Sequence, residues 1–527
     1  NGRVVADIAE VLGLSGTGGS VGSEVLVLRG ALDRESLALG VLALPSTAHR
    51  LAWLADHLAA LPGSGIIYTL TVAASQQVAD YLRERGFAVA AYSGQTEQTE
   101  RLAAEEDLIH NRVKALVATS ALGMGFDKPD LGFVVHFGAP SSPISYYQQV
   151  GRAGRGVGSA RVVLLPGSDD EAIWDYFASI GFPPERQVRA TLAALEDAGG
   201  TGNRAEVVST ATLETRVELS RTRLEMMLKV LDVDGAVRRV RGGWLSTGQP
   251  WRYDADRYAR VAQVRRDEQQ AMRDYLVTGT CRMRFLREQL DDDGATDCGR
   301  CDNCGGVSLD PVTSARAVAA AVGTIERPGI PLDPRRMWPS AMPALGVQLK
   351  GKITAGELAE QGRAVARFTD LGLGRQVRAA VAHDGAVPAE LITAAVTVLA
   401  AWSWAQRPVA VVHIESSARP LLVRDLGAQL ARIGRLADLG PVTAGQPADT
   451  PARRGPRSNS AQRLRSVWAA YELPSSLTER LAGELRAAPV LLVDDYLDSG
   501  WTMAVVARML RMAGAGAVYP FVLGAAG

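Results

Sequence analysis

The fold of the first half of this 527-residue chain is decided by residues 115–155, which contain ALVATSALGMGFD at 115–127 and QQVGRAGR at 148–155. The apolar runs Ala115–Thr119 and Phe133–Phe137 predict two buried strands. The segments before them alternate between predicted strands and helices: Ser64–Thr69, Ala73–Arg85, Ala88–Tyr92 and Gln95–His110. Strands that alternate with helices predict an α/β fold with a parallel sheet and helices on both faces.

Composition bounds the protein class. The chain is long enough for about three or four domains, and 47% hydrophobic residues support packed cores. Net charge is zero at a pI near 7.2, so nucleic-acid binding has to come from local basic clusters. No apolar run reaches the length of a membrane span, and the sequence as given opens with no charged-then-apolar leader. We expect a cytoplasmic, nucleoid-associated monomer without a membrane contact.

All four cysteines lie in one stretch with the spacing C-x16-C-x2-C-x2-C, namely Cys281, Cys298, Cys301 and Cys304. Thiolates at this spacing can close a tetrahedron around Zn²⁺, and closed four-ligand sites are structural. Two disulfides are the alternative, but the chain far exceeds the size of disulfide-dense domains. We therefore predict one structural zinc ion at these cysteines.

Further along the chain, the pattern outlines a winged helix. Leu213–Leu219 and a second helix from the N-cap Ser220 to Leu231 precede a hairpin at Ala236–Thr247, broken by Gly242 and Gly243. One helix is expected over Asp254–Leu290. The predicted boundaries are 1–30 (tail of a preceding domain), 31–168 (parallel sheet), 169–252 (winged helix), 253–306 (zinc-binding helical subdomain), 307–334 (linker) and 335–527 (a second α/β domain).

The order of these pieces resembles the second motor domain of superfamily-two helicases, and with the cysteine cluster it resembles the RecQ family of DNA helicases. The resemblance covers roughly residues 1–305, with Gly65–Tyr68 as motif IV, Ala118–Asp127 as motif V and Gln149–Arg155 as motif VI. It implies a RecA-like parallel sheet domain. In RecQ helicases the zinc subdomain usually precedes the winged helix, and here that order is reversed.

The resemblance also implies roles for individual side chains. Arg152 and Arg155, with Gln149, would act catalytically by stabilising charge on a transferring phosphoryl group. Gly125 and Asp127 would contact the nucleotide, and the alternative for Asp127 is a helix or turn cap. Thr119 and Ser120 would contact the DNA backbone without reading its sequence.

The 527 residues contain no G-x-x-x-x-G-K-[ST] phosphate loop and no D-E-x-H stretch, although RecQ helicases use both to hold ATP and Mg²⁺. Residues 1–5 resemble the sequence after the family's motif III. We therefore expect a fragment that lacks the first motor domain, so that ATP and Mg²⁺ bind only in a longer protein and this chain alone does not hydrolyse ATP.

Basic residues gather in the predicted winged helix and are candidates for DNA binding: Arg221, Arg223, Arg239 and Arg241. Helix N-termini and arginines suit phosphates. Trp244, at the hairpin tip, is either a base-stacking residue or the hydrophobic plug of the wing.

The stretch VLLVDDYLDSGWT at 490–502 is an apolar strand followed by two acids and a small-residue loop. It resembles the phosphoribosyl diphosphate loop of ComF-like type I phosphoribosyltransferases. The resemblance implies that Asp494 and Asp495 bind ribose, that the 5′-phosphate is held by Ser499, Gly500 and Thr502, and that 415–419 forms a diphosphate loop. Two residues depart from that family, because Asp498 would repel phosphate and Trp501 would crowd the pocket. A non-catalytic phosphate or DNA contact and a purely structural module remain alternatives.

The resemblance to RecQ helicases implies an ATP-dependent 3′–5′ DNA helicase that acts in DNA repair or recombination at junctions of single-stranded and duplex DNA. The first alternative is a non-catalytic DNA-binding module. The second is phosphoribosyltransferase activity in the C-terminal domain. Protein partners cannot be named from the sequence.

Overall fold

The computed structural model describes residues 32–122, 126–179, 181–200, 206–339, 342–445 and 460–526. The chain divides into two compact units: unit 1 combines Asn1–Ser179 with Asp256–Ile325, and unit 2 combines Ile180–Ala255 with Glu326–Gly527. The predicted tail at 1–30 and Gly125 lie outside the described residues. None of the described helices combines the length and apolar character that a membrane crossing requires.

Unit 1 is built on a six-stranded parallel sheet, which confirms the predicted α/β fold of this region. Its strand order is β1-β6-β5-β2-β4-β3. The strands are β1 (Leu37–Val41), β2 (Ser64–Thr69), β3 (Val89–Tyr92), β4 (Ala115–Ala118), β5 (Leu131–Phe137) and β6 (Ala160–Leu165). The neighbours β5 and β2 are buried along their whole length, because a strand covered on both faces is apolar throughout.

The helices of unit 1 that lie within the first 179 residues are α2 (Thr47–His57), α3 (Val72–Arg83), α4 (Gln98–Ile109), α5 (Pro143–Val150) and α6 (Asp170–Ser179). The predicted winged-helix start at residue 169 is wrong, because α6 belongs to unit 1. Its Trp174 is buried in the core of the sheet domain and donates from Nε1 to the carbonyl of Ala139 at 2.8 Å.

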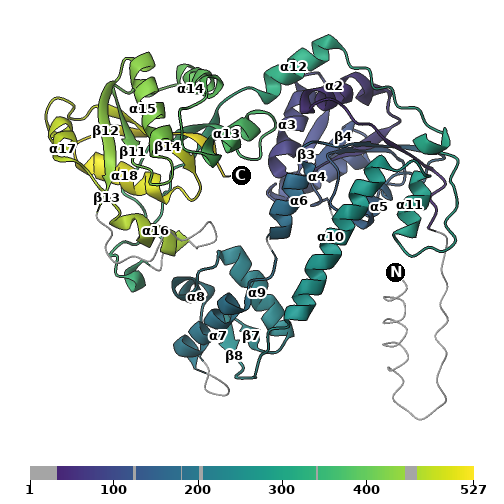
Figure 1. Cartoon of the computed structure of the whole chain (residues 1–527), viewed down its shortest axis with the longest axis horizontal. Coiled ribbons are helices and arrows are strands. Elements are labelled where there is room, and N and C mark those ends of the chain that lie inside the picture. Colours follow the sequence, from purple (N-terminus) through teal and green to yellow (C-terminus); the bar gives the residue numbers. More distant parts are fainter. Residues whose placement is uncertain are drawn as a thin grey trace. The chain divides into compact units, whose positions relative to one another are not determined.

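The chain returns to unit 1 through α10 (Ala255–Val277), α11 (Arg282–Glu288) and α12 (Ala315–Ile325). The predicted single helix over 254–290 is interrupted, and Cys281 caps the N-terminus of α11 instead of lying inside a helix. The predicted linker at 307–334 is also wrong. Helix α12 packs against α2 and α3 (Figure 1), and Ala317 accepts a hydrogen bond from the Tyr81 hydroxyl at 3.2 Å.

Unit 2 contains a helical part with a two-stranded hairpin, as the winged-helix outline predicts. Its elements are α7 (Glu185–Gly199), α8 (Thr210–Arg216), α9 (Arg221–Val233), β7 (Val237–Val240) and β8 (Gly243–Ser246). Helix α7 was not predicted, and its Val188 and Leu195 join the same buried cluster as Leu224 and Trp244.

The rest of unit 2 is a seven-stranded sheet of order β13-β12-β11-β14-β15-β10-β9. The two outermost pairs are antiparallel and the inner pairs parallel. Its strands are β9 (Ile330–Leu332), β10 (Gly362–Arg367), β11 (Ala410–Ile414), β12 (Ala437–Ala444), β13 (Tyr471–Glu472), β14 (Pro489–Leu497) and β15 (Ala517–Ala525).

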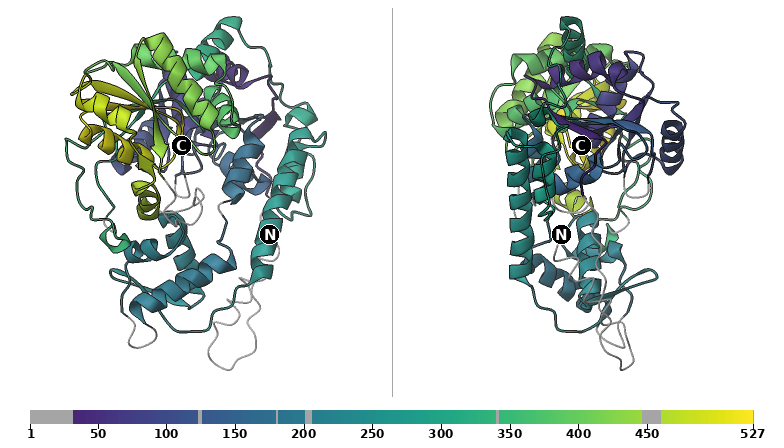
Figure 2. Two further views of the ribbon diagram at one scale, coloured as in Figure 1. Left: turned by 60° about the vertical axis from the view of Figure 1, so that its left-hand side comes forward. Right: turned by 90° about the vertical axis from the view of Figure 1, so that its right-hand side faces the viewer.

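Helices cover both faces of this second sheet (Figure 2). One face packs against α13 (Leu373–Ala382), α14 (Ala389–Ala401) and α15 (Pro420–Gly434). The other face packs against α17 (Ser475–Ala482) and α18 (Trp501–Met512), and α16 (Ser460–Trp468) lies against α18. The last third of the chain is therefore an α/β domain with helices on both faces of a largely parallel sheet.

Candidate functional sites

The arginine turn, residues 151–155, directly follows α5. Arg152 donates from Nη1 to the carbonyl of Phe126 at 3.1 Å, and its buried Nε has no hydrogen-bond partner among the described residues. Arg155 forms a half-exposed ion pair with Asp127 at 3.0 Å. Asp127 therefore orients Arg155. In the arginine turn, Arg152 has an unused donor, whereas Arg155 is paired.

His136, at the end of β5, is a residue that the sequence did not single out. Its Nε2 lies 2.7 Å from Oε1 of Gln149, and its ring stacks on Tyr68 with centroids 5.2 Å apart. Burial lowers the pKa of His136 to about 4, so the ring is neutral at pH 7. Because the amide oxygen of Gln149 can only accept, Nε2 carries the proton. His136 thereby fixes the orientation of Gln149, and a histidine within an otherwise apolar strand was the available signal.

The structure separates the two residues expected to contact the DNA backbone after β4. Thr119 is buried, and its hydroxyl accepts a hydrogen bond from the amide of Ala121 at 3.4 Å. Ser120 is exposed. Of this pair, the Ser120 side chain is open to a ligand, whereas the Thr119 side chain is buried.

The four cysteines converge on one point in unit 1. Their sulfur atoms all lie within 4.8 Å of one another, and the sulfurs of Cys281 and Cys301 are 4.0 Å apart. These separations suit a tetrahedron with Zn–S bonds of about 2.3 Å. All four cysteines are free thiols, so the two-disulfide alternative is not realised. The cluster is compatible with a structural zinc ion.

Backbone amides surround the sulfurs and favour their ionised form. The amides of Arg284 and Cys298 donate to Cys281 Sγ at 3.5 and 3.1 Å. Burial acts to raise the pKa of Cys281, but these amide bonds, together with hydrogen bonds from the thiols of Cys298 and Cys304, outweigh it and the pKa is lowered. Burial raises the pKa of the other three thiols. Thiolate is the form that binds metal, so of the four sulfurs Cys281 is the one whose surroundings favour the metal-binding form.

A polar cleft of about 370 Å³ lies between α9 and the β7–β8 hairpin. Its lining includes three basic side chains, Arg221, Lys229 and Arg239. Lys229 was not predicted, although Arg221, Glu225 and Lys229 recur every four residues and so share one face of α9. Glu225 accepts from Arg221 at 3.1 Å and holds that arginine in place. Phosphate groups are the natural ligands of such a basic cleft.

Two of the predicted DNA-binding side chains are buried in the structure. Trp244 is 3% exposed, and its Nε1 donates to the Thr210 hydroxyl at 3.3 Å. Arg223 is 6% exposed and donates to the carbonyl of Gly181 at 3.2 Å. Trp244 therefore belongs to the buried cluster that joins the β7–β8 hairpin to the helices. Arg241 and Arg239 are exposed, so they remain available for DNA.

The predicted phosphoribosyl diphosphate loop lies at one edge of the second sheet. Strands β11 and β14 are parallel neighbours, so the loops after them meet at that edge. Arg419 Nε lies 2.6 Å from the buried Asp495 carboxylate, to which Ser416 also donates at 3.4 Å. Burial, together with the charge of Asp495, raises the pKa of Asp494 well above its ordinary value. Asp495 is therefore engaged by Arg419, whereas Asp494 accepts a hydrogen bond from the amide of Asp495 at 2.9 Å.

The two departures from the phosphoribosyltransferase pattern are accommodated within unit 2. The carboxylate of Asp498 forms an ion pair with Arg463, which offsets its repulsion of a phosphate. Trp501 is buried and stacks on Trp338 with centroids 6.0 Å apart, so its ring does not fill the loop. Gly500 adopts φ +75°, a conformation that suits glycine, and it leads directly into the N-terminus of α18.

Comparison with known proteins supports the sequence resemblance for part of the chain. Residues 49–157 match the family described as the helicase conserved C-terminal domain. The ATP-dependent DNA helicase RecQ of Synechocystis sp. is 31% identical over 253 residues, which are 46% of this chain and 49% of that protein. The probable ATP-dependent DNA helicase RecS of Bacillus subtilis is 32% identical over 27% of this chain and 29% of that protein.

The chain thus spans about half the length of these curated relatives, or less. Among solved structures, E. coli DEAD-box protein SrmB bound to regulator of ribonuclease activity A is 26% identical over 27% of this chain and 84% of that chain, with a TM-score of 0.24. Residues 49–157 are therefore similar to the helicase conserved C-terminal domain, and about half of the chain is similar to a RecQ-type ATP-dependent DNA helicase.

Proposed function

We propose that this chain supplies the second motor domain, the zinc-binding subdomain and the winged helix of a RecQ-type ATP-dependent 3′–5′ DNA helicase that acts in DNA repair or recombination. The arginine turn carries the proposal. Arg152 has unused donor capacity, and Arg155 is oriented by Asp127, within the segment that matches the helicase family. An arginine aimed across a domain cleft stabilises charge on a transferring γ-phosphoryl group.

The test compares this chain with a longer protein in which an ATP-binding motor domain precedes it. DNA-stimulated ATP hydrolysis and unwinding of a 3′-tailed duplex are expected only in the longer protein. DNA binding without turnover in either protein would contradict the helicase proposal and favour the alternative of a non-catalytic binding module.

The basic cleft of the winged helix is expected to hold DNA phosphates. Lys229→Ala and Arg239→Ala should each weaken DNA binding to a similar extent for all sequences and should lower the slope of log K against log salt by about 1. Fluorescence anisotropy at several salt concentrations measures both effects. Arg186→Ala removes an exposed charge from α7, away from the cleft lining, and should leave the slope unchanged. Equal slopes in all four proteins would place DNA binding elsewhere.

We further propose that the C-terminal α/β domain binds phosphoribosyl diphosphate. The proposal rests on the ion pair between Arg419 and Asp495, one of the two acids near the end of β14, and on the glycine turn that opens α18. A helix N-terminus favours phosphate through its free amides and its dipole. Two measurements separate the alternatives. Binding distinguishes a phosphate contact from a purely structural role, and turnover distinguishes transferase chemistry from a non-catalytic contact.

Asp494→Asn is expected to weaken phosphoribosyl diphosphate binding about tenfold, because the amide offers the ribose hydroxyls one oxygen where the carboxyl group offers two. Isothermal titration calorimetry with Mg²⁺ present measures the change. Asp438→Asn, an exposed acid on β12, is the matched control and should bind as the wild type does. Binding that is absent from the wild-type chain would overturn the proposal.

A further inference from the structure

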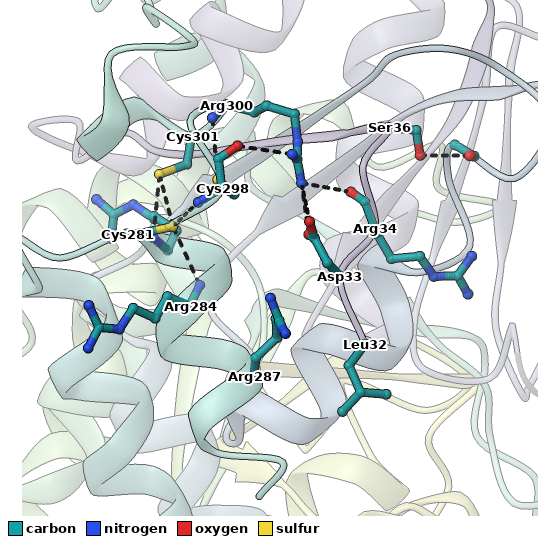
Figure 3. A network of polar contacts seen from close by, with 12 residues as sticks. Leu32, Asp33, Arg34, Ser36, Cys281, Arg284, Arg287, Cys298, Arg300 and Cys301 are labelled. Carbon is teal, nitrogen blue, oxygen red and sulfur yellow. Dashed lines mark hydrogen bonds and ion pairs between the residues drawn. The ribbon is translucent and has the colours of Figure 1, made fainter. Parts of the chain in front are cut away.

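The segment Leu32–Val41, which enters the first sheet through β1, is held from two sides. On one side lies the cysteine knuckle, residues 298–304. On the other side lies the arginine turn, residues 151–155. Figure 3 shows the knuckle and this segment together, with Arg300 reaching from the cysteines to Asp33.

On the knuckle side, the contact is an ion pair. Arg300 Nη2 lies 2.7 and 3.0 Å from the two carboxylate oxygens of Asp33 and 3.5 Å from the carbonyl of Arg34. Arg300 is itself tied to a metal ligand, because its amide donates to Cys298 Sγ at 3.4 Å and its Nη1 donates to the Cys298 carbonyl at 2.9 Å. Further along the segment, Asp302 accepts the amide of Val41 at 2.9 Å.

On the side of the arginine turn, hydroxyl groups make the contacts. Ser36 donates to the carbonyl of Gly154 at 2.7 Å, and the hydroxyl of Tyr147 donates to the carbonyl of Leu32. Gly154 has φ +73°, and a Cβ on it would lie 2.3 Å from the Ser36 hydroxyl. Only glycine at position 154 allows the arginine turn to lie this close to Ser36. A shift of Ser36 would therefore also move the backbone of the arginine turn.

We propose that Asp33 is a positioning residue for the arginine turn and that its ion pair with Arg300 transmits the order of the cysteine knuckle to that turn. An ordered knuckle holds Arg300, Arg300 holds Asp33, and the segment from Leu32 to Ser36 then holds Gly154 and Tyr147. The ion pair is partly shielded, since the side chains are 31% and 24% exposed. The catalytic meaning of this link rests on the proposed helicase function, whereas the link itself does not.

Hydrogen–deuterium exchange of the 527-residue chain tests the link without ATP hydrolysis. The amides of Gly154 and Gly156 donate to Leu131 and Pro129, at 3.1 and 2.6 Å, and report on the turn. Asp33→Asn, which leaves the knuckle side chains intact, should speed exchange in 145–156 roughly fivefold, the size expected for loss of one ion pair. Bound zinc should stay at the wild-type level.

Three further variants make the test specific. Arg300→Ala should give the same pattern, and the charge-reversed pair Asp33→Arg with Arg300→Asp should restore protection. Arg284→Ala removes an exposed arginine of α11 that pairs with Glu288, so exchange in 145–156 should match the wild type. If Asp33→Asn loosens 32–36 and leaves 145–156 unchanged, the proposal is wrong, whether or not the longer protein is a helicase.

In the longer, active protein, Asp33→Asn should lower kcat for ATP hydrolysis with little change in KM for ATP. An active longer protein with a wild-type kcat for this variant would reject the positioning role and leave the helicase function standing.

Discussion

Arg152→Ala, in a protein that also contains the ATP-binding motor domain, is expected to lower kcat for DNA-stimulated ATP hydrolysis by about 10³-fold. The reason is that Arg152 has a buried Nε with no hydrogen-bond partner among the described residues, although one Nη is anchored on the Phe126 carbonyl. An anchored guanidinium with free donors can stabilise developing negative charge without first losing another partner. Steady-state ATPase assays measure the loss.

The controls separate catalysis from folding and from DNA binding. Arg152→Lys keeps the charge but loses the planar fork, so its activity should fall between those of wild type and alanine variant. Arg112→Ala removes an exposed, ion-paired arginine on the surface of unit 1 and should retain full activity. DNA affinity should be unchanged in all three variants. An Arg152→Ala protein with a normal kcat would remove this residue from the catalytic machinery.

Cys301→Ser is expected to abolish zinc binding and to unfold the knuckle. Cys301 is 0% exposed, and its sulfur accepts a hydrogen bond from the amide of Arg282 at 3.4 Å. Water therefore cannot take the place of the lost Cys301 sulfur unless the core opens. Structural zinc contributes roughly 10–16 kcal/mol to folding in small zinc domains. Zinc content should fall from about one ion per chain to near zero, with a clear fall in the Tm of unit 1.

The matched control is Asp297→Ser. It also introduces a serine, but at an exposed position next to Cys298 and not at a cysteine. It should keep its zinc and its Tm. A Cys301→Ser protein that retains one zinc ion would show that the cluster is not a four-cysteine site. Plasma emission spectrometry and thermal unfolding provide the two readouts.

Strand positions and the cysteine cluster were predictable because their signals are local. Buried parallel strands such as β2 and β5 are continuous apolar runs, and two C-x2-C turns place their sulfurs together within a few residues. The same reasoning failed at 307–334, where Ala- and Pro-rich composition hid α12, a helix that is stable because it packs on α2 and α3. The two neighbouring strands β1 and β6 were not predicted, although both are largely apolar and buried.

By itself, the sequence determined the α/β class, the four cysteines that can share one metal ion and the order of segments that resembles a RecQ helicase, because each depends on residues close together along the chain. The tertiary structure decided which side chains are available. It buried Trp244 and Arg223, paired Asp498 with Arg463, and brought His136 to Gln149 and Asp33 to Arg300. These contacts join residues 13 to 267 positions apart, and only packing can decide which of many distant partners meet.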